Sequence, residues 1–185
     1  SQLTAGLNQP ITKVTESPLA PVLRDLLGTQ SLEKTRQHLL AAQTPQLLQV
    51  LYSYRSLDVP DLRPYLEVAR NQPLSKERSL ELSSRQDAIE CVRAIPATES
   101  IFKDRNRIAM PDETLRLQTG TDRDKALLLH VLLEHVNRAN STADKLVTLV
   151  TVENSFVCGH DFCISLNTLS EAPRPTEGIL WQLSD

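Results

Sequence analysis

The chain has 185 residues, of which 40% are hydrophobic and 23% are charged, and its formal net charge is -3. This composition is ordinary for a globular protein and lacks the basic stripe with interleaved aromatic residues that nucleic-acid binding favours, so we expect no nucleic-acid partner. No apolar stretch approaches the roughly 18 residues of a bilayer-crossing helix, so we also expect no membrane span.

The first half of the chain has a helical pattern. Residues 1–16 are polar and predict a flexible N-terminal arm. After them, a polar residue repeatedly stands beside a proline, which favours the first turn of a helix, and apolar residues recur at spacings of three and four. Helices are predicted near 18–27, 31–42, 45–56 and 60–71. Because short helices are marginal alone, residues 17–95 are expected to form an α-helical region that packs on itself or on the second half.

The middle of the chain continues this pattern and then becomes polar. A helical segment is predicted from 75 to 95, with a break near Ser83 and Ser84. The polar stretch that follows contains Lys103, Arg105 and Arg107. Two interpretations of this basic cluster stay open, a solvated loop and a docking patch for an acidic partner.

The second half changes to a mixed pattern. A short helix is predicted from Pro111, and a longer one over 121–138, where apolar residues recur at helical spacing. Residues 146–152 then alternate apolar and small polar side chains, as strands do, and 156–166 is predicted to be their hairpin partner. With a last strand over 178–185, the sequence predicts an α+β fold in which helices precede a small antiparallel sheet.

The motif with the most functional content lies at the start of the longer helix. It reads Gly120-Thr121-Asp122-Arg123-Asp124-Lys125 and runs into an apolar helix. Downstream come Gly159-His160-Asp161-Phe162 and a final strand with Trp181 and Asp185. This order resembles the transglutaminase-like (papain-like cysteine) superfamily, in which a cysteine begins a helix, a histidine opens a strand before an aromatic residue, and an aspartate ends a later strand. The resemblance covers about residues 110–185 and assigns 96–185 to a transglutaminase-like region.

The nucleophile departs from the family pattern, because Asp122 stands where the cysteine would be. A thiol at a helix N-terminus is activated by the helix dipole, whereas an aspartate there attacks no amide. The resemblance therefore implies degenerate triad positions Asp122, His160 and Asp185. Asp122 and Thr121 are also explained by helix capping alone.

The function that the resemblance implies is a non-catalytic protein-, peptide- or glycan-binding or scaffold module. A protein or peptide partner is expected, with a glycan as a further possibility. The candidate binding residues are Thr121, Arg123, Asp124, Phe162 and Trp181.

Two other classes of function stay open. One is a cysteine-dependent hydrolase or acyltransferase with a rearranged site that uses Cys91 or Cys158 with His160. The other is a mostly helical adaptor whose C-terminal hairpin owes nothing to the superfamily. Neither cysteine is at a helix N-terminus, where a thiolate would be favoured.

No metal or other cofactor is expected. Alternation on a single strand would place Cys158 and His160 on one face and Cys163 on the other, which separates the candidate ligands. His130 and His135 diverge around their helix, because they are five residues apart. The three cysteines form no disulfide framework, which favours a cytoplasmic setting, and a start at Ser1 without methionine agrees with a fragment of a larger protein.

Overall fold

The structure is a computed structural model that describes residues 45–104, 106–142 and 144–184. The predicted N-terminal arm and the predicted helices at 18–27 and 31–42 lie outside these residues. The chain divides into two compact units, Ser1–Val50 and Leu51–Asp185. The second unit holds the sheet and almost all of the described helices.

Six helices are present in the described residues. Their bounds are α3 Pro45–Ser53, α4 Arg63–Arg70, α5 Pro73–Ser79, α6 Arg85–Arg93, α7 Pro111–Leu117 and α8 Asp122–Ala139. Prolines in the first turn begin α4, α5 and α7. The predicted break in 75–95 is confirmed, because Ser84 caps α6 by accepting a hydrogen bond from the Asp87 backbone N–H and so starts a new helix.

The sheet is antiparallel and has the strand order β4-β3-β2-β1-β5. Its strands are β1 Val147–Thr151, β2 Ser155–Cys158, β3 Cys163–Ser165, β4 Ser170–Glu171 and β5 Ile179–Leu183. The α+β class, with helices before the sheet, is confirmed.

The prediction of one strand over 156–166 is wrong. The chain reverses between β2 and β3 in a tight turn, where the Gly159 N–H donates to the Phe162 carbonyl at 3.0 Å. Cys158 and Cys163 are therefore cross-strand partners on the same face of the sheet, and not on opposite faces. A Cβ at position 159 would meet the Phe162 ring at 2.3 Å, so this turn requires glycine.

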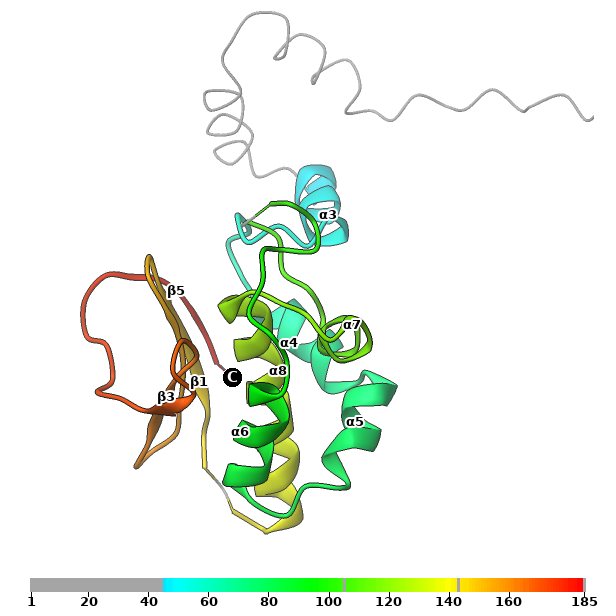
Figure 1. Ribbon diagram of the computed structural model, residues 1–185. Coiled ribbons are helices and arrows are strands. Elements are labelled where there is room, and N and C mark those ends of the chain that lie inside the picture. The colour runs from blue at the N-terminus through cyan, green and yellow to red at the C-terminus, as the bar shows by residue number, and fades with distance from the viewer. Residues whose placement is uncertain (1–44, 105, 143, 185) are drawn as a thin grey trace, which may run out of the picture. The chain divides into compact units, whose positions relative to one another are not determined.

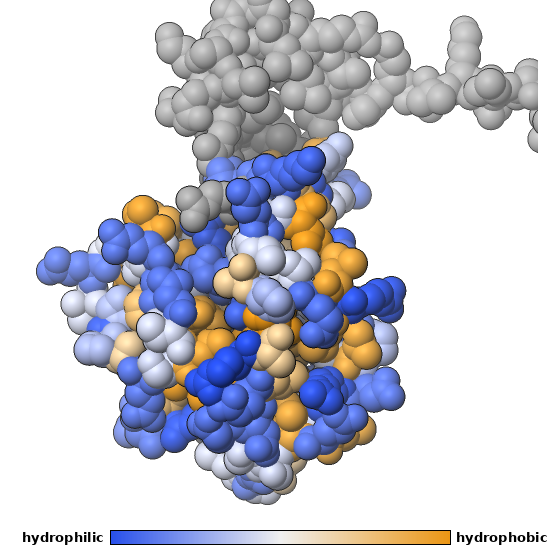
Figure 2. Space-filling view, in the orientation of Figure 1, coloured by the Kyte–Doolittle hydropathy of each residue, from blue (hydrophilic) through white to orange (hydrophobic). Residues whose placement is uncertain are grey.

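Helix α8 is central to the packing of this unit. In Figure 1 the sheet lies on one side of α8 and helices α4, α5 and α7 lie on the other. The α8 residues Leu127, Leu128, Leu129, Val131, Leu132 and Leu133 are each at most 1% exposed. Helices α4 to α6 all contact α8, so the expected boundary at 95/96 falls inside one compact unit with shared cores. Figure 2 shows the apolar residues of one face lying between predominantly polar ones.

A buried polar network also ties α8 to its neighbours. The Arg70 Nε on α4 donates to Glu134 at 2.7 Å, and the same carboxylate accepts from His130 Nε2 at 3.1 Å. His130 Nδ1 in turn bonds the Thr148 hydroxyl of β1 at 2.8 Å. This chain of hydrogen bonds links α4, α8 and the sheet.

None of the helices in the described part of the chain is both long and apolar enough to cross a bilayer.

Candidate functional site

The N-terminus of α8 is fixed by a reciprocal cap. The Thr121 hydroxyl accepts from the Asp124 backbone N–H at 3.2 Å, and the Asp124 carboxylate accepts from the Thr121 N–H at 2.9 Å. A third bond, from the Ala109 N–H to Asp124 at 2.7 Å, ties the cap to the chain before α7. Burial raises the pKa of the Asp124 carboxyl, although the hydrogen bonds that it accepts oppose this rise. Asp124 is fully buried and so serves the fold.

Asp122 differs from Asp124 because it is only half-buried at the first residue of α8. Its Oδ2 accepts a hydrogen bond of 2.5 Å from the hydroxyl of Ser155, the first residue of β2. Ser155 itself is fully buried. Within the described residues, the second carboxylate oxygen of Asp122 has no hydrogen-bond partner. Asp122 therefore retains an acceptor for a ligand.

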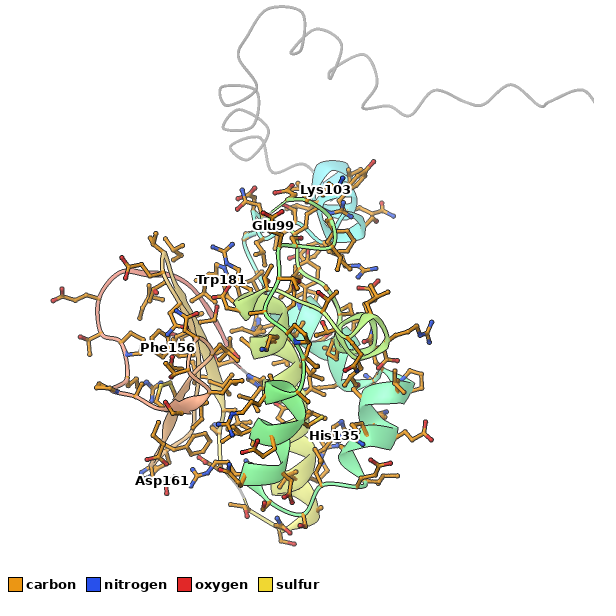
Figure 3. All side chains as sticks on the ribbon, viewed as in Figure 1. Glu99, Lys103, His135, Phe156, Asp161 and Trp181 are labelled. Carbon is orange, nitrogen blue, oxygen red and sulfur yellow. A yellow bond between two sulfur atoms is a disulfide. The ribbon has the colours of Figure 1, made fainter. Side chains whose placement is uncertain are left out.

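A cleft of about 580 Å³ opens at this helix end. One part of its lining is the loop after α6, including Glu99 and Lys103, and another is Asn167, which follows β3. The remaining lining residues are Ala97, Thr98, Ser100, Asp104, Thr121, Asp122 and Arg123. Figure 3 shows Glu99 and Lys103 together at this end of the molecule. The cleft thus carries charges of both signs on a rigid base, the capped first turn of α8.

The structure does not bring His160 to Asp122. His160 is exposed in the turn between β2 and β3, where its backbone N–H donates to the Asp144 carboxylate at 2.9 Å. It lines a separate hollow with Phe162 and Arg174. β2 runs from Ser155 to Cys158, roughly 10 Å of extended chain, and His160 lies two residues beyond its end. Figure 3 places the neighbouring Asp161 at the opposite end of the sheet from Glu99 and Lys103.

The expected triad of Asp122, His160 and Asp185 is therefore not assembled as predicted. The physical reason is the turn at Gly159, which begins a new strand and puts His160 at the end of the hairpin away from α8's first turn. Asp185 lies outside the described residues, so its placement stays a prediction.

The five candidate binding residues separate into two groups. Thr121 and Arg123 line the cleft. Asp124 is buried in the cap, Phe162 lies under the Arg85 guanidinium at 4.1 Å from the ring centroid, and Trp181 packs against the core group around Leu127 and Val131. The buried Nε1 of Trp181 has no hydrogen-bond partner in the described structure.

The cysteines offer little to a thiol mechanism. Cys158 and Cys163 form a disulfide, which the predicted placement of the two residues on opposite faces of one strand would not allow. Their contact follows from the cross-strand register of β2 and β3. Cys91 is free but buried, and its sulfur accepts from Arg78 Nε at 3.4 Å. Among the described residues, no group of three or more metal-ligating side chains is suited to hold an ion.

Sequence reasoning missed two residues of this site, Ser155 and Asn167. Asn154, which precedes Ser155 in the chain, connects the two segments. Its side chain donates to the Ser165 hydroxyl at 2.8 Å and accepts from the Asn167 N–H at 3.2 Å. The available signal was the turn that must join residues 146–152 to 156–166, since Ser155 stands at its end and opens β2.

Comparison with family models, with curated proteins and with solved structures finds no match to this chain. What the structure defines is an α+β protein with a polar cleft at the N-terminus of its central helix.

Proposed function

We propose that this chain contains a non-catalytic, degenerate transglutaminase-like domain that binds a polypeptide segment in the cleft at the start of α8. The observation that carries the proposal is the Asp122–Ser155 pair, a carboxylate and a hydroxyl held 2.5 Å apart at a helix N-terminus that lines the cleft. A helix tip meeting the first residue of a strand is the arrangement that a thiol and an imidazole would need.

The order of elements supports the relationship. In the family pattern a histidine opens a strand and an aspartate follows at the end of a later strand. Here Ser155 opens β2, and Asn167 lies two residues beyond the end of β3 and lines the same cleft. The degenerate triad then consists of Asp122, Ser155 and Asn167. Such a set has neither a thiol to attack nor an imidazole to take a proton, so it favours binding over catalysis.

The lining of the cleft favours a polypeptide over a glycan. Glu99, Asp104 and Asp122 are acidic, whereas Lys103 and Arg123 are basic. A peptide with charged side chains complements both signs, whereas a neutral sugar offers no charge to either. The free acceptor of Asp122 suits a donor group such as an ammonium or a backbone N–H.

The test is a binding screen of the full chain against a library of mixed-charge peptides, followed by substitution. We expect Asp122→Asn to weaken binding of the selected peptide by about tenfold or more, because a hydrogen bond to a charged group contributes about 1.5–3 kcal/mol. Asp161→Asn is the matched control, since Asp161 is exposed in the distant hairpin turn. Equal losses from the two variants would contradict the proposal.

The cysteine-dependent alternative has its own experiment. If Cys91 or Cys158 were a nucleophile assisted by His160, a thiol-directed electrophile would modify one cysteine selectively at neutral pH, and His160→Ala would abolish that reaction. We expect no such selective reaction in the native protein, because Cys158 is bonded to Cys163 and Cys91 is buried. Mass spectrometry of the labelled peptides decides between the two.

A further inference from the structure

The β2–β3 hairpin connects the disulfide to the cleft. At its closed end, Cys158 and Cys163 face each other and are joined. At its open end, Ser155 holds Asp122, and the chain after β3 continues to Asn167 in the cleft lining. The hairpin is short, so its two ends are coupled by only a few ladder hydrogen bonds.

The side chains at the two ends of the hairpin point to different faces of the sheet. Ser155 pairs with Val150 and faces α8. Cys158 and Cys163 belong to a small cluster with Leu149 on the other face, where they are 0% and 5% exposed. A change in the sulfur pair therefore acts on the hairpin through its backbone register and without touching the cleft directly.

Formation of the disulfide and order of the hairpin are thermodynamically linked. An ordered hairpin holds the two sulfurs in contact and so favours the bond, and by reciprocity the bond favours the ordered hairpin. Two contacts of the turn do not involve the sulfur atoms, namely the Gly159–Phe162 backbone hydrogen bond and the contact of Phe162 with Arg85 of α6. The reduced hairpin therefore remains able to form, at a lower stability.

We propose that the Cys158–Cys163 pair is a redox-sensitive element that sets the order of the β2–β3 hairpin and, through Ser155 and Asn167, the binding competence of the cleft. The effect on the hairpin stands alone, whereas the effect on binding rests on the proposed function.

The redox step is thiol–disulfide exchange with a low-molecular-weight disulfide such as oxidised glutathione, and because both sulfurs are buried it takes place when the short hairpin opens locally. The thiolate of one cysteine attacks the glutathione disulfide, which forms a mixed disulfide and releases one reduced glutathione. The second cysteine, as its thiolate, then attacks the mixed disulfide, so that the protein disulfide forms and a second reduced glutathione leaves. The protein loses two electrons and two protons, and glutathione disulfide gains them.

The first experiment measures the thiol state and hydrogen exchange of the full chain in oxidised and in reduced glutathione. Peptide-mapped alkylation separates the pair from Cys91, which serves as an internal control. We expect the pair to be protected from alkylation in oxidised glutathione and both thiols to be alkylated after reduction. We also expect amide exchange over 155–167 to be roughly tenfold slower when oxidised, with the C-terminal half of α8 unchanged.

Two outcomes would overturn the proposal for the hairpin: free thiols at both positions in excess oxidised glutathione, or equal exchange over 155–167 in the two states. The variant Cys163→Ser should exchange like the reduced protein in either buffer, which separates the bond from a general effect of the buffer. No ligand enters these measurements, so their failure is distinguishable from failure of the proposed function.

The second experiment measures binding of the selected peptide in the two redox states. We expect weaker binding after reduction, with the same loss in Cys163→Ser in either buffer. Suppose that the peptide binds with equal affinity in both states although amide exchange over 155–167 differs. The proposed effect of the disulfide on binding would then be overturned, whereas the proposed function would still be tested by Asp122→Asn.

Discussion

Three aspartates near the start of α8 or in the hairpin turn show how position decides the role of one residue type. Asp124 is buried, accepts two backbone N–H groups and holds the cap. Asp122, two residues earlier, is half-buried, shares one oxygen with Ser155 and keeps the other for a ligand. Asp161 is exposed in the turn. Of the three, Asp122 is the one that lines the cleft.

The first residue-scale prediction concerns Asp122, at the position that the proposed relationship assigns to the nucleophile. We expect Asp122→Cys to give no detectable turnover of amide or ester substrates, because its neighbour Ser155 cannot take the thiol proton as an imidazole does. Release of a chromogenic leaving group above the rate of the unmodified protein would contradict this expectation. A triple substitution that also introduces Ser155→His and Asn167→Asp is the informative companion, since it restores all three chemical groups.

At the scale of elements, the two faces of the edge strand β5 differ in burial. Trp181 pairs with Val150 of β1 and packs toward the core, whereas its neighbour Leu180 is 54% exposed. Since Trp181 is half-buried, its contribution is smaller than the 3 to 5 kcal/mol expected of a fully buried tryptophan.

We therefore predict that Trp181→Ala lowers the free energy of unfolding by about 2 kcal/mol, through lost contacts with the core group around Leu127. Leu180→Ala is the control on the same strand and should change it by less than about 0.5 kcal/mol. Urea unfolding followed by circular dichroism measures both. Equal effects of the two substitutions would show that Trp181 does not help to hold β5 on the core.

At the scale of the whole molecule, the Arg70–Glu134–His130–Thr148 network joins α4, α8 and the sheet. Burial alone would raise the pKa of Glu134, but hydrogen bonds and charge attraction from Arg70 and His130 outweigh it and lower the pKa from 4.5 to about 2. A carboxyl with a lowered pKa in the folded state stabilises that state above its unfolded pKa. This stabilisation is lost as the pH falls from about 4.5 to about 2.

We predict that Glu134→Gln destabilises the protein at pH 7 by roughly 3 kcal/mol and that this difference from the unmodified protein shrinks as the pH falls through this window. Urea unfolding at pH 7, 4 and 2.5 measures the difference. Glu177→Gln, at an exposed position, is the control for the substitution itself. A constant difference at all three values would mean that charge on Glu134 is not what stabilises the fold.

Much of the helical layer is predictable from local sequence because its signals are local. Proline in the first turn and a capping hydroxyl, as at Ser84, act within four residues. The β2–β3 hairpin was missed because Gly159, His160 and Asp161, which form its turn, were interpreted as part of one strand from Phe156 to Leu166. The Asp122–Ser155 pair was missed because it depends on the register of β2 against β1 and on where α8 packs against the sheet. Such tertiary register has no local signature.

The ammonium group of Lys125 has an effect beyond its own contacts. It is 3% exposed, donates to the Ile95 carbonyl at 2.8 Å, and burial lowers its pKa. Ile95 lies two residues before Ala97, where the rim of the cleft begins. A single interior amine thus anchors the departure point of that rim to the first turn of α8. The position of the cleft rim therefore depends on a buried side chain that does not itself line the cleft.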